Sequence, residues 1–205
     1  MIKANRSWLY QTFFNFYINR IIRSDFEKFI VLGEVDTNGR SVLLIPNHFS
    51  WWDGFFAWQL NQKLFKRQFN VIMLEEQLKK HMFFSRIGAF SISPGSRSIS
   101  ESLNHCVNIL GDNSNLLVFF PQGKINSQHC TQLKFMPGVE RIIAHSPNVC
   151  VVFASVLVDY YSNKKPSVAI TLCEYKGQAS VAELEKEFNS FRNNCINNQD
   201  NIFTT

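Results

Sequence analysis

Two side chains that titrate, His48 and Asp53, are separated by four residues and follow the apolar run 42–45. A loop at the end of a strand can present an imidazole to a substrate, while a carboxylate one turn further on holds the second ring nitrogen. Because a free histidine side chain has a pKa of about 6.5, such a pair can remove a proton from an alcohol at neutral pH. The spacing therefore predicts a general base. The alternative is that Asp53 is simply the N-cap of a helix over 54–66.

A second loop carries polar groups after an apolar run. Residues 119–124 read Phe-Phe-Pro-Gln-Gly-Lys and follow the run 116–119. In open α/β folds, ligands bind outside the carboxyl ends of the strands, where such loops meet. We therefore expect this loop and His48 to border one crevice.

The two loops resemble conserved blocks of the glycerolipid acyltransferases, the PlsC-like lysophosphatidic acid acyltransferase family. Asn47-His48 and Asp53 resemble the first block, the HX4D motif, and residues 120–123 resemble the Phe-Pro-Glu-Gly block. Residues 88–92 with Arg97 resemble the second block, and 135–139 the segment that follows the third. The resemblance runs in the right order from about residue 40 to residue 160.

The resemblance implies an O-acyltransferase of phospholipid biosynthesis that moves a fatty acyl group from acyl carrier protein or coenzyme A to a lysophospholipid-like acceptor. His48 would deprotonate the acceptor hydroxyl and Asp53 would fix the tautomer of its ring. Backbone N–H groups near Gly123 would serve the oxyanion, or the glycine would only form a tight turn. We expect no metal and no cofactor besides the thioester. The expected substrate contacts are Arg97, Phe120, Pro121, Gln122, Gly123 and Lys124.

The sequence departs from the family pattern at its charged positions. Pro94 stands where the second block has its first arginine, Gln122 replaces the glutamate of the third block, and Lys124-Ile125 replaces Thr-Arg. A buried charge without its partner is costly, so an acid and a base that form an ion pair should be lost together. We predict that Gln122 holds its loop through neutral hydrogen bonds. The acceptor would then be a lysophospholipid or a non-phosphate lipid, glycolipid, aminolipid or pigment; the rival interpretation is a non-catalytic lipid-binding or carrier-docking module.

Composition and patterning predict one α/β domain. The chain has 205 residues, 45% of them hydrophobic, and five widely spaced cysteines, which favours reduced thiols over a disulfide framework. We expect a layered domain at 29–195, with a mixed, mostly parallel central sheet flanked by helices, and a polar tail at 196–205, with the chain frayed from about residue 193. Strands are expected at 29–35, 42–45, 70–74, 89–93, 116–120, 149–158 and 167–174. Helices are expected at 54–65, 76–85, 98–110, 138–145 and 181–194.

The N-terminal region, 1–28, predicts an amphipathic helix over 7–23 that could lie on a membrane. Aromatic and aliphatic residues alternate there with Lys3, Arg6, Arg20 and Arg23, and no stretch is long and apolar enough to span a bilayer. The alternative is a helix packed on the domain. Both interpretations hold if one face of the helix packs on the domain and the other contacts lipid. The net charge of +5 suits an anionic lipid surface or an acidic carrier. We expect a cytoplasmic protein at the inner face of the cell membrane, with no nucleic-acid partner.

Overall fold

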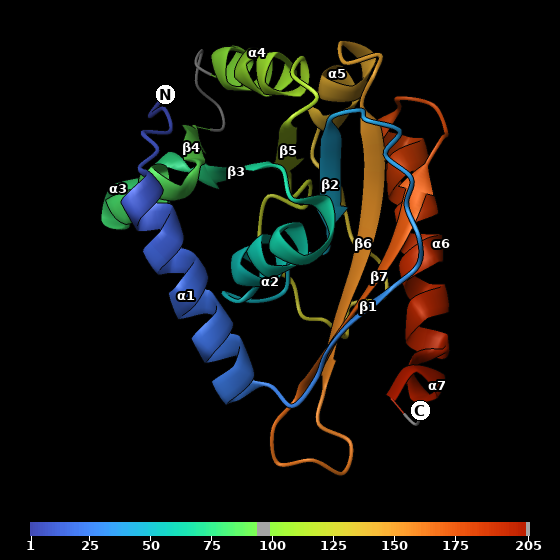
Figure 1. The fold of residues 1–205 in the computed structure, drawn as a ribbon. Helices are drawn as coiled ribbons and strands as arrows, with labels where there is room; N and C mark the ends of the chain where they lie inside the picture. Colours follow the sequence, from blue (N-terminus) through green and yellow to red (C-terminus); the bar gives the residue numbers. More distant parts are fainter. Residues whose placement is uncertain (94–98, 204–205) are drawn as a thin grey trace.

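The computed structural model of the chain describes residues 1–93 and 99–203. Within these residues, seven strands form one sheet in the order β1-β7-β6-β2-β5-β3-β4 (Figure 1). Arg97 and Pro94 of the expected second block lie outside the described residues. The strands are β1 (Phe29–Leu32), β2 (Val42–Pro46), β3 (Gln68–Leu74), β4 (Ala89–Ile92), β5 (Asn115–Val118), β6 (Cys150–Asp159) and β7 (Ser167–Tyr175).

All strand pairs are parallel except β6 and β7, which form an antiparallel hairpin. Because β1 pairs in parallel with β7, these two strands run against the other five. The expected fold class, a mixed and mostly parallel α/β sheet with flanking helices, is therefore confirmed. The strand β2 lies between β5 and β6, and both of its faces are covered, which explains why residues 42–46 are all buried.

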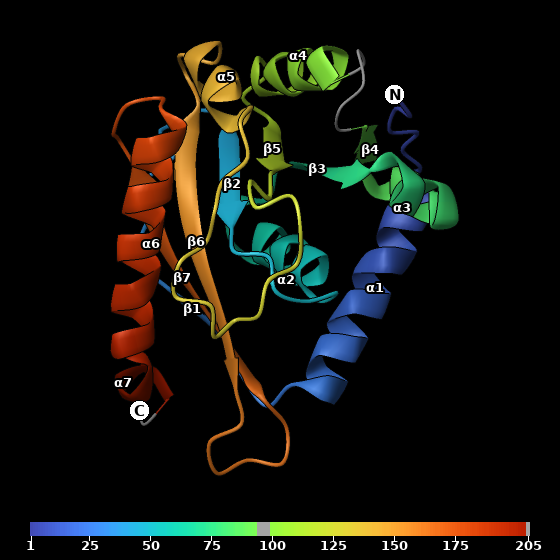
Figure 2. The same ribbon diagram turned by 180° about the vertical axis from the view of Figure 1, so that it is seen from behind.

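Helices cover both faces of the sheet (Figures 1 and 2). They are α1 (Trp8–Asp25), α2 (Asp53–Leu60), α3 (Glu75–Lys80), α4 (Ile99–Leu110), α5 (Val139–Ala144), α6 (Val181–Asn197) and α7 (Gln199–Phe203). Val42 and Leu44 of β2 point into a core shared with α1, α2 and α3, whereas Leu43 and Ile45 point into a second core shared with α4, α5 and α6. Successive side chains of a strand face opposite sides, so one strand serves two cores.

Two expected helices are each divided in the structure. After α2, the residues Asn61–Phe65 form a π-helical turn, and after α3 the residues Met82–Ile87 form a 3-10 helix. The π turn has a local cause: the buried Asn61 side chain donates to the Arg67 carbonyl and accepts its N–H, while the Lys66 N–H donates to the Asn61 carbonyl. Periodicity cannot reveal such a side-chain cap.

The expectation of a frayed tail is wrong as far as the chain is described. Helix α6 continues to Asn197, and α7 follows it. Leu184 and Phe188 are buried in the second core, and Arg192 and Cys195, on either side of the asparagines at 193 and 194, are buried as well. Packing therefore overrides the weak helix propensity of asparagine.

Helix α1 packs one face on the domain and leaves the other exposed. Phe14, Ile18 and Ile22 are buried, and the Phe14 ring meets the Trp58 ring edge-on at a centroid distance of 5.1 Å. The opposite face carries large exposed side chains, namely Leu9, Tyr10, Phe13, Phe16 and Tyr17. In the part of the chain that the structure describes, no helix combines the length and the hydrophobicity required to cross a bilayer.

The five cysteines are free thiols of very different accessibility. Burial raises the pKa of the Cys106 thiol to about 12 and that of Cys150 to about 11. Only the thiolate reacts with alkylating reagents, and Cys173 is exposed. We therefore expect iodoacetamide at pH 8 to label Cys173 first and Cys130 next, and to leave Cys106 and Cys150 unmodified until the protein unfolds. Peptide mass mapping over time tests this order; early labelling of Cys106 would contradict the packing of α4 on the sheet.

Candidate active site

His48 and Asp53 meet just beyond the carboxyl end of β2. The distance from Nδ1 of His48 to Oδ2 of Asp53 is 2.7 Å. The same Oδ2 accepts the backbone N–H groups of Phe49 and Ser50, and Oδ1 accepts the Ser50 hydroxyl. The Asp53 side chain is 1% exposed, whereas that of His48 is 25% exposed. One ring nitrogen is thus fixed by a carboxylate that cannot reorient, and Nε2 on the far side of the ring remains available to a substrate.

The alternative function of Asp53 as an N-cap does not hold. Asp53 is the first residue of α2, its N-cap position is occupied by Trp52, and no side-chain cap is formed there. The carboxylate instead points back toward the loop 48–50 and takes part in four hydrogen bonds there. A carboxylate at the first turn of a helix is also favoured by the helix dipole.

Asn47 ties this loop to a neighbouring strand. Its amide nitrogen donates to the Val156 carbonyl (2.9 Å) and its oxygen accepts the Val156 N–H (2.7 Å). This partner lies 109 positions away in the sequence, on β6. The residue before the imidazole is therefore anchored to the centre of the sheet, so the backbone of His48 has little freedom.

The Gln122 amide holds both backbone polar groups of His48. Its Oε1 accepts the His48 N–H (2.7 Å), and its Nε2 donates to the His48 carbonyl (3.1 Å) and to Oδ1 of Asn126 (2.8 Å). The Asn126 N–H also donates to the His48 carbonyl (2.9 Å). The neutral hydrogen bonds expected for Gln122 are present. A carboxylate at this buried position could accept the first bond but could not donate the other two.

Some of the other residues of the loop 119–124 pack or form hydrogen bonds, and others are exposed to solvent. The Phe120 ring lies against the imidazole of His48 at a centroid distance of 4.3 Å, and the Pro121 carbonyl accepts the Met136 N–H (2.7 Å). Gly123 adopts φ +65° and donates its N–H to the Phe120 carbonyl, so this N–H belongs to the turn and is not free for an oxyanion. The Lys124 side chain is exposed on the same corner.

Three residues of α6 hold the segment that follows this loop, and the sequence analysis missed them. The buried Arg192 guanidinium donates to the carbonyls of Cys130 and Gln128. Asn189 bonds both backbone groups of Leu133, and Glu185 accepts the Phe135 N–H. We call Glu185, Asn189 and Arg192 the α6 clamp. Burial lowers the pKa of the Arg192 guanidinium from its ordinary value. In the sequence these three residues form a polar stripe at helical spacing. Solvent-exposed helix faces show the same pattern, so the sequence alone does not single these residues out.

The described residues contain no group of three or more His, Cys, Asp or Glu side chains arranged to hold a metal ion. Within this described part, the chemical groups at the site are therefore the imidazole, the Asp53 carboxylate, the amides of Gln122 and Asn126 and the exposed Lys124 ammonium. Such a set is suited to proton transfer with a hydroxyl.

Comparisons with known proteins identify a family and a similar fold. The family model described as Acyltransferase matches residues 28–157. No curated protein matches the chain. Among solved structures, the chain is similar to the crystal structure of the 1-acyl-sn-glycerophosphate (LPA) acyltransferase PlsC from Thermotoga maritima, with a TM-score of 0.61 and 16% identity over 93% of this chain and 79% of that chain. At this identity the similarity concerns the fold.

Proposed function

Because this chain belongs to the acyltransferase family, we propose that it transfers a fatty acyl group from acyl carrier protein or coenzyme A to a hydroxyl of a lysophospholipid-like acceptor. The observation that carries the proposal is the imidazole of His48, held on one side by the buried Asp53 and through its backbone by Gln122. Such rigid support is what a general base requires, because the proton must be taken at a fixed geometry.

The proposed reaction proceeds without a covalent enzyme intermediate. Nε2 of His48 takes the proton of the acceptor hydroxyl as the oxygen attacks the thioester carbonyl. The tetrahedral intermediate then collapses, the C–S bond breaks, and the leaving thiolate receives the proton from the imidazolium. Asp53 stabilises that imidazolium through Nδ1. We assign substrate contacts to Phe120, Pro121, Gln122, Gly123 and Lys124 on the loop, and to Arg97 from the sequence pattern alone.

The acceptor is identified by offering many lipids at once. Purified protein is incubated with radiolabelled acyl-acyl carrier protein or acyl-coenzyme A and a total lipid extract, and the products are analysed by mass spectrometry. We expect one labelled ester product that His48→Ala does not form. A labelled lysophosphatidate would identify a phosphate-bearing acceptor. A labelled glycolipid, aminolipid or pigment would identify the alternative acceptor class, and the absence of any acylated product would favour a non-catalytic lipid-binding or carrier-docking module.

Arg97 distinguishes the two acceptor classes. A guanidinium grips a phosphate through two parallel hydrogen bonds, and charged hydrogen bonds contribute about 1.5–3 kcal/mol. We therefore expect Arg97→Ala to raise the KM for lysophosphatidate at least about tenfold, with a smaller effect of Lys124→Ala, because a lysine is a mobile point charge. Steady-state kinetics on the two variants measures this. An unchanged KM for Arg97→Ala would remove the phosphate contact from the proposal.

We further propose that the exposed face of α1 rests on the cytoplasmic surface of the cell membrane, which supplies the lipid acceptor. Leu9, Phe13 and Phe16 lie on this face, and Arg20 follows one turn after Phe16. Aromatic side chains with cationic neighbours suit the headgroup boundary of an anionic bilayer. The inner-face location follows from this assignment.

Removal of one aromatic ring from this face should weaken vesicle binding. Burial of a phenylalanine side chain contributes about 1.5–3 kcal/mol, so Phe16→Ser should lower the partition coefficient on phosphatidylglycerol vesicles at least about tenfold. The matched control is Tyr160→Ser, since Tyr160 is similarly exposed but lies in the turn between β6 and β7. Co-sedimentation with vesicles measures both. Equal losses in the two variants would contradict the assignment of α1 as the membrane-binding helix.

A further inference from the structure

The aromatic ring of Phe120 lies against the imidazole of His48. The two ring centroids are 4.3 Å apart and the ring planes are inclined by 30°. We propose that Phe120 is a positioning residue that acts through His48, because the face of its ring stabilises the imidazolium that forms when the base takes the proton of the acceptor hydroxyl. This role depends on the proposed function and is separate from the substrate contact assigned to Phe120 above.

The Phe120 ring is held in place before any substrate arrives. The N–H of the preceding residue, Phe119, donates to the Leu44 carbonyl of β2 (3.0 Å), and the Phe120 carbonyl accepts the Gly123 N–H (3.1 Å). The ring itself packs against the first core, the one shared with α1, α2 and α3. A group that is fixed in this way needs no reorganisation at the moment of reaction.

Other aromatic side chains close to His48 in the sequence have different partners. Trp51 and Trp52 belong to the same loop, but their rings meet the Phe55 ring at centroid distances of 4.4 Å and 5.9 Å. Within residues 1–93 and 99–203, Phe120 is the one side chain whose ring stacks on the imidazole. The contact therefore comes from the loop after β5, not from the loop that carries the base.

A protonated imidazole gains more from this contact than a neutral imidazole does. The face of an aromatic ring is negative, and it attracts a cation that lies within about 6 Å of the ring centre. Such contacts change an equilibrium constant by about two- to thirtyfold. A general base is neutral before the reaction and cationic once it holds the proton, so the attraction grows toward the transition state. Interactions that strengthen only there raise kcat and leave KM unchanged.

Phe120 and Asp53 contact different parts of the imidazole. Asp53, at the start of α2, lies 2.7 Å from Nδ1, whereas Phe120 covers a face of the ring. The loop 119–124 carries one other charged group, the exposed Lys124. Rotation of the imidazole out of its plane would bring it into collision with the phenyl ring. Both contacts therefore favour the cation, and together they keep Nε2 in one direction.

Fluorination of Phe120 tests the proposal, because each fluorine withdraws charge from the ring face and changes the shape of the ring little. Mono-, di- and trifluorophenylalanine are introduced at position 120 of the full chain. The assay is single-turnover transfer to oleoyl-lysophosphatidate in detergent, from palmitoyl-coenzyme A or palmitoyl-acyl carrier protein. We expect the logarithm of the rate to fall steadily with the number of fluorines, to about tenfold below the unmodified protein, with the KM for either substrate unchanged.

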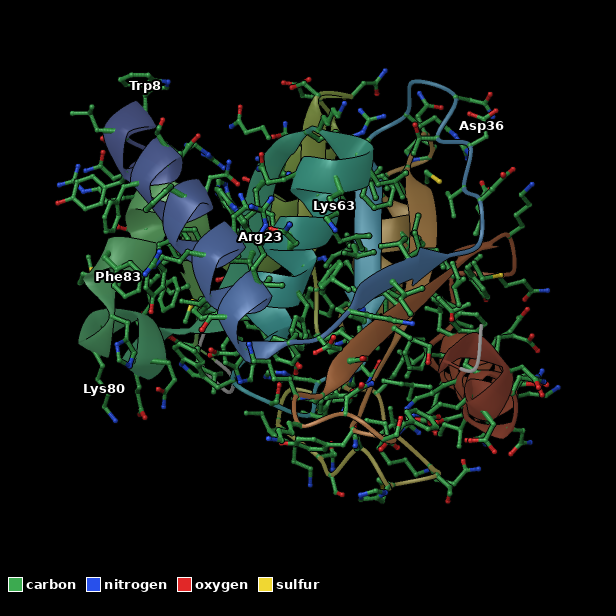
Figure 3. All side chains as sticks on the ribbon, turned by 60° about the horizontal axis from the view of Figure 1, so that its bottom comes forward. Trp8, Arg23, Asp36, Lys63, Lys80 and Phe83 are labelled. Carbon is green, nitrogen blue, oxygen red and sulfur yellow. The ribbon has the colours of Figure 1, made fainter. Side chains whose placement is uncertain are left out.

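Two side-chain replacements and a matched control accompany the series. Phe120→Tyr keeps an electron-rich ring and should retain the rate within about twofold, whereas Phe120→Leu has no ring and should lose about tenfold. The control is the same fluorination at Phe83, which lies beside α1 (Figure 3). Its ring stacks on Phe84 with similar geometry, at 4.0 Å and 33°, but meets a neutral ring. Fluorination there should leave the rate unchanged.

A rate that stays constant along the fluorine series would overturn the proposal, whether the KM for the thioester stays the same or rises. In the first case the ring would only fill space, and in the second it would contact only the acyl chain. An NMR titration without substrate separates this failure from a failure of the proposed function. The pH at which half of His48 is protonated should fall along the series. If it falls but the unmodified protein transfers no acyl group, the stabilisation of the imidazolium stands and the proposed function is wrong.

Discussion

Replacing His48 with alanine should reduce acyl transfer by about 10²–10⁴-fold, the contribution expected of a positioned general base. The imidazole makes its side-chain hydrogen bond to Asp53, and its backbone is held independently by Gln122 and Asn126. Removal of the ring therefore deletes the base and leaves the loop supported. Initial rates with a radiolabelled thioester measure the loss, and thermal unfolding with vesicle co-sedimentation checks that the fold and lipid binding persist.

The control for this variant is His129→Ala, since His129 is exposed in the segment after the loop 119–124. It should keep the full rate. Asp53→Asn tests the stabilisation of the imidazolium: an amide oxygen can take the place of Oδ2, but it is neutral and its hydrogen bonds are weaker than those of a carboxylate, so we expect a lower rate together with reduced stability. An undiminished rate in His48→Ala would remove the general-base assignment.

Replacing Gln122 with glutamate should lower activity about 10²-fold and destabilise the protein, although it restores the residue of the family pattern. The carboxylate would face the His48 carbonyl and Oδ1 of Asn126, to which the amide now donates. A buried charge without a partner costs about 3–5 kcal/mol. The displaced backbone of His48 would also misplace the ring, and an error of about 1 Å at a catalytic group costs about 10²-fold in rate. Steady-state kinetics and chemical denaturation measure the two effects.

The matched control for charge is Gln178→Glu on an exposed loop, which should change neither rate nor stability measurably. A second test restores the missing cation. In Gln122→Glu/Ile125→Arg the carboxylate regains a basic neighbour, so part of the lost activity should return. A clear gain of activity in Gln122→Glu alone would mean that the glutamine is a tolerated replacement with no structural function.

Much of the fold could be predicted because hydrophobic patterning reports burial. The apolar runs at 42–45, 116–120 and 149–158 mark strands covered on both faces, and each is a strand in the structure within two residues of either end. The polar segment 162–166 between the last two expected strands is typical of a hairpin turn, and β6 and β7 do form a hairpin. The π turn after α2 was missed because it depends on the hydrogen bonds between the Asn61 side chain and the backbone of Arg67, and the helical tail was missed because it depends on the packing of α6.

The candidate site, like the fold, could be predicted only in part from the sequence. The proximity of His48 and Asp53 follows from their spacing, since the two residues are only five positions apart in the sequence. The connection of Gln122 to His48 follows from the rule that parallel strands end at one edge, because β2 and β5 are neighbours. The long-range ties of Asn47 to Val156 and of α6 to the segment 128–135 could not be read from residue types. Asparagine and arginine at these positions are also common on surfaces.

The α6 clamp has a consequence for the order in which the molecule is assembled during synthesis. Residues 128–135 receive their backbone partners from Glu185, Asn189 and Arg192, which leave the ribosome some fifty to sixty positions later. Contacts this far apart in sequence form late, because the intervening chain must close first. While a nascent chain still lacks α6, the His48–Asp53 pair can already form, but the Gln122 loop has an unsecured downstream end. We therefore expect chains that still lack α6 to be inactive, because the segment after the Gln122 loop is held only once this last long helix has emerged.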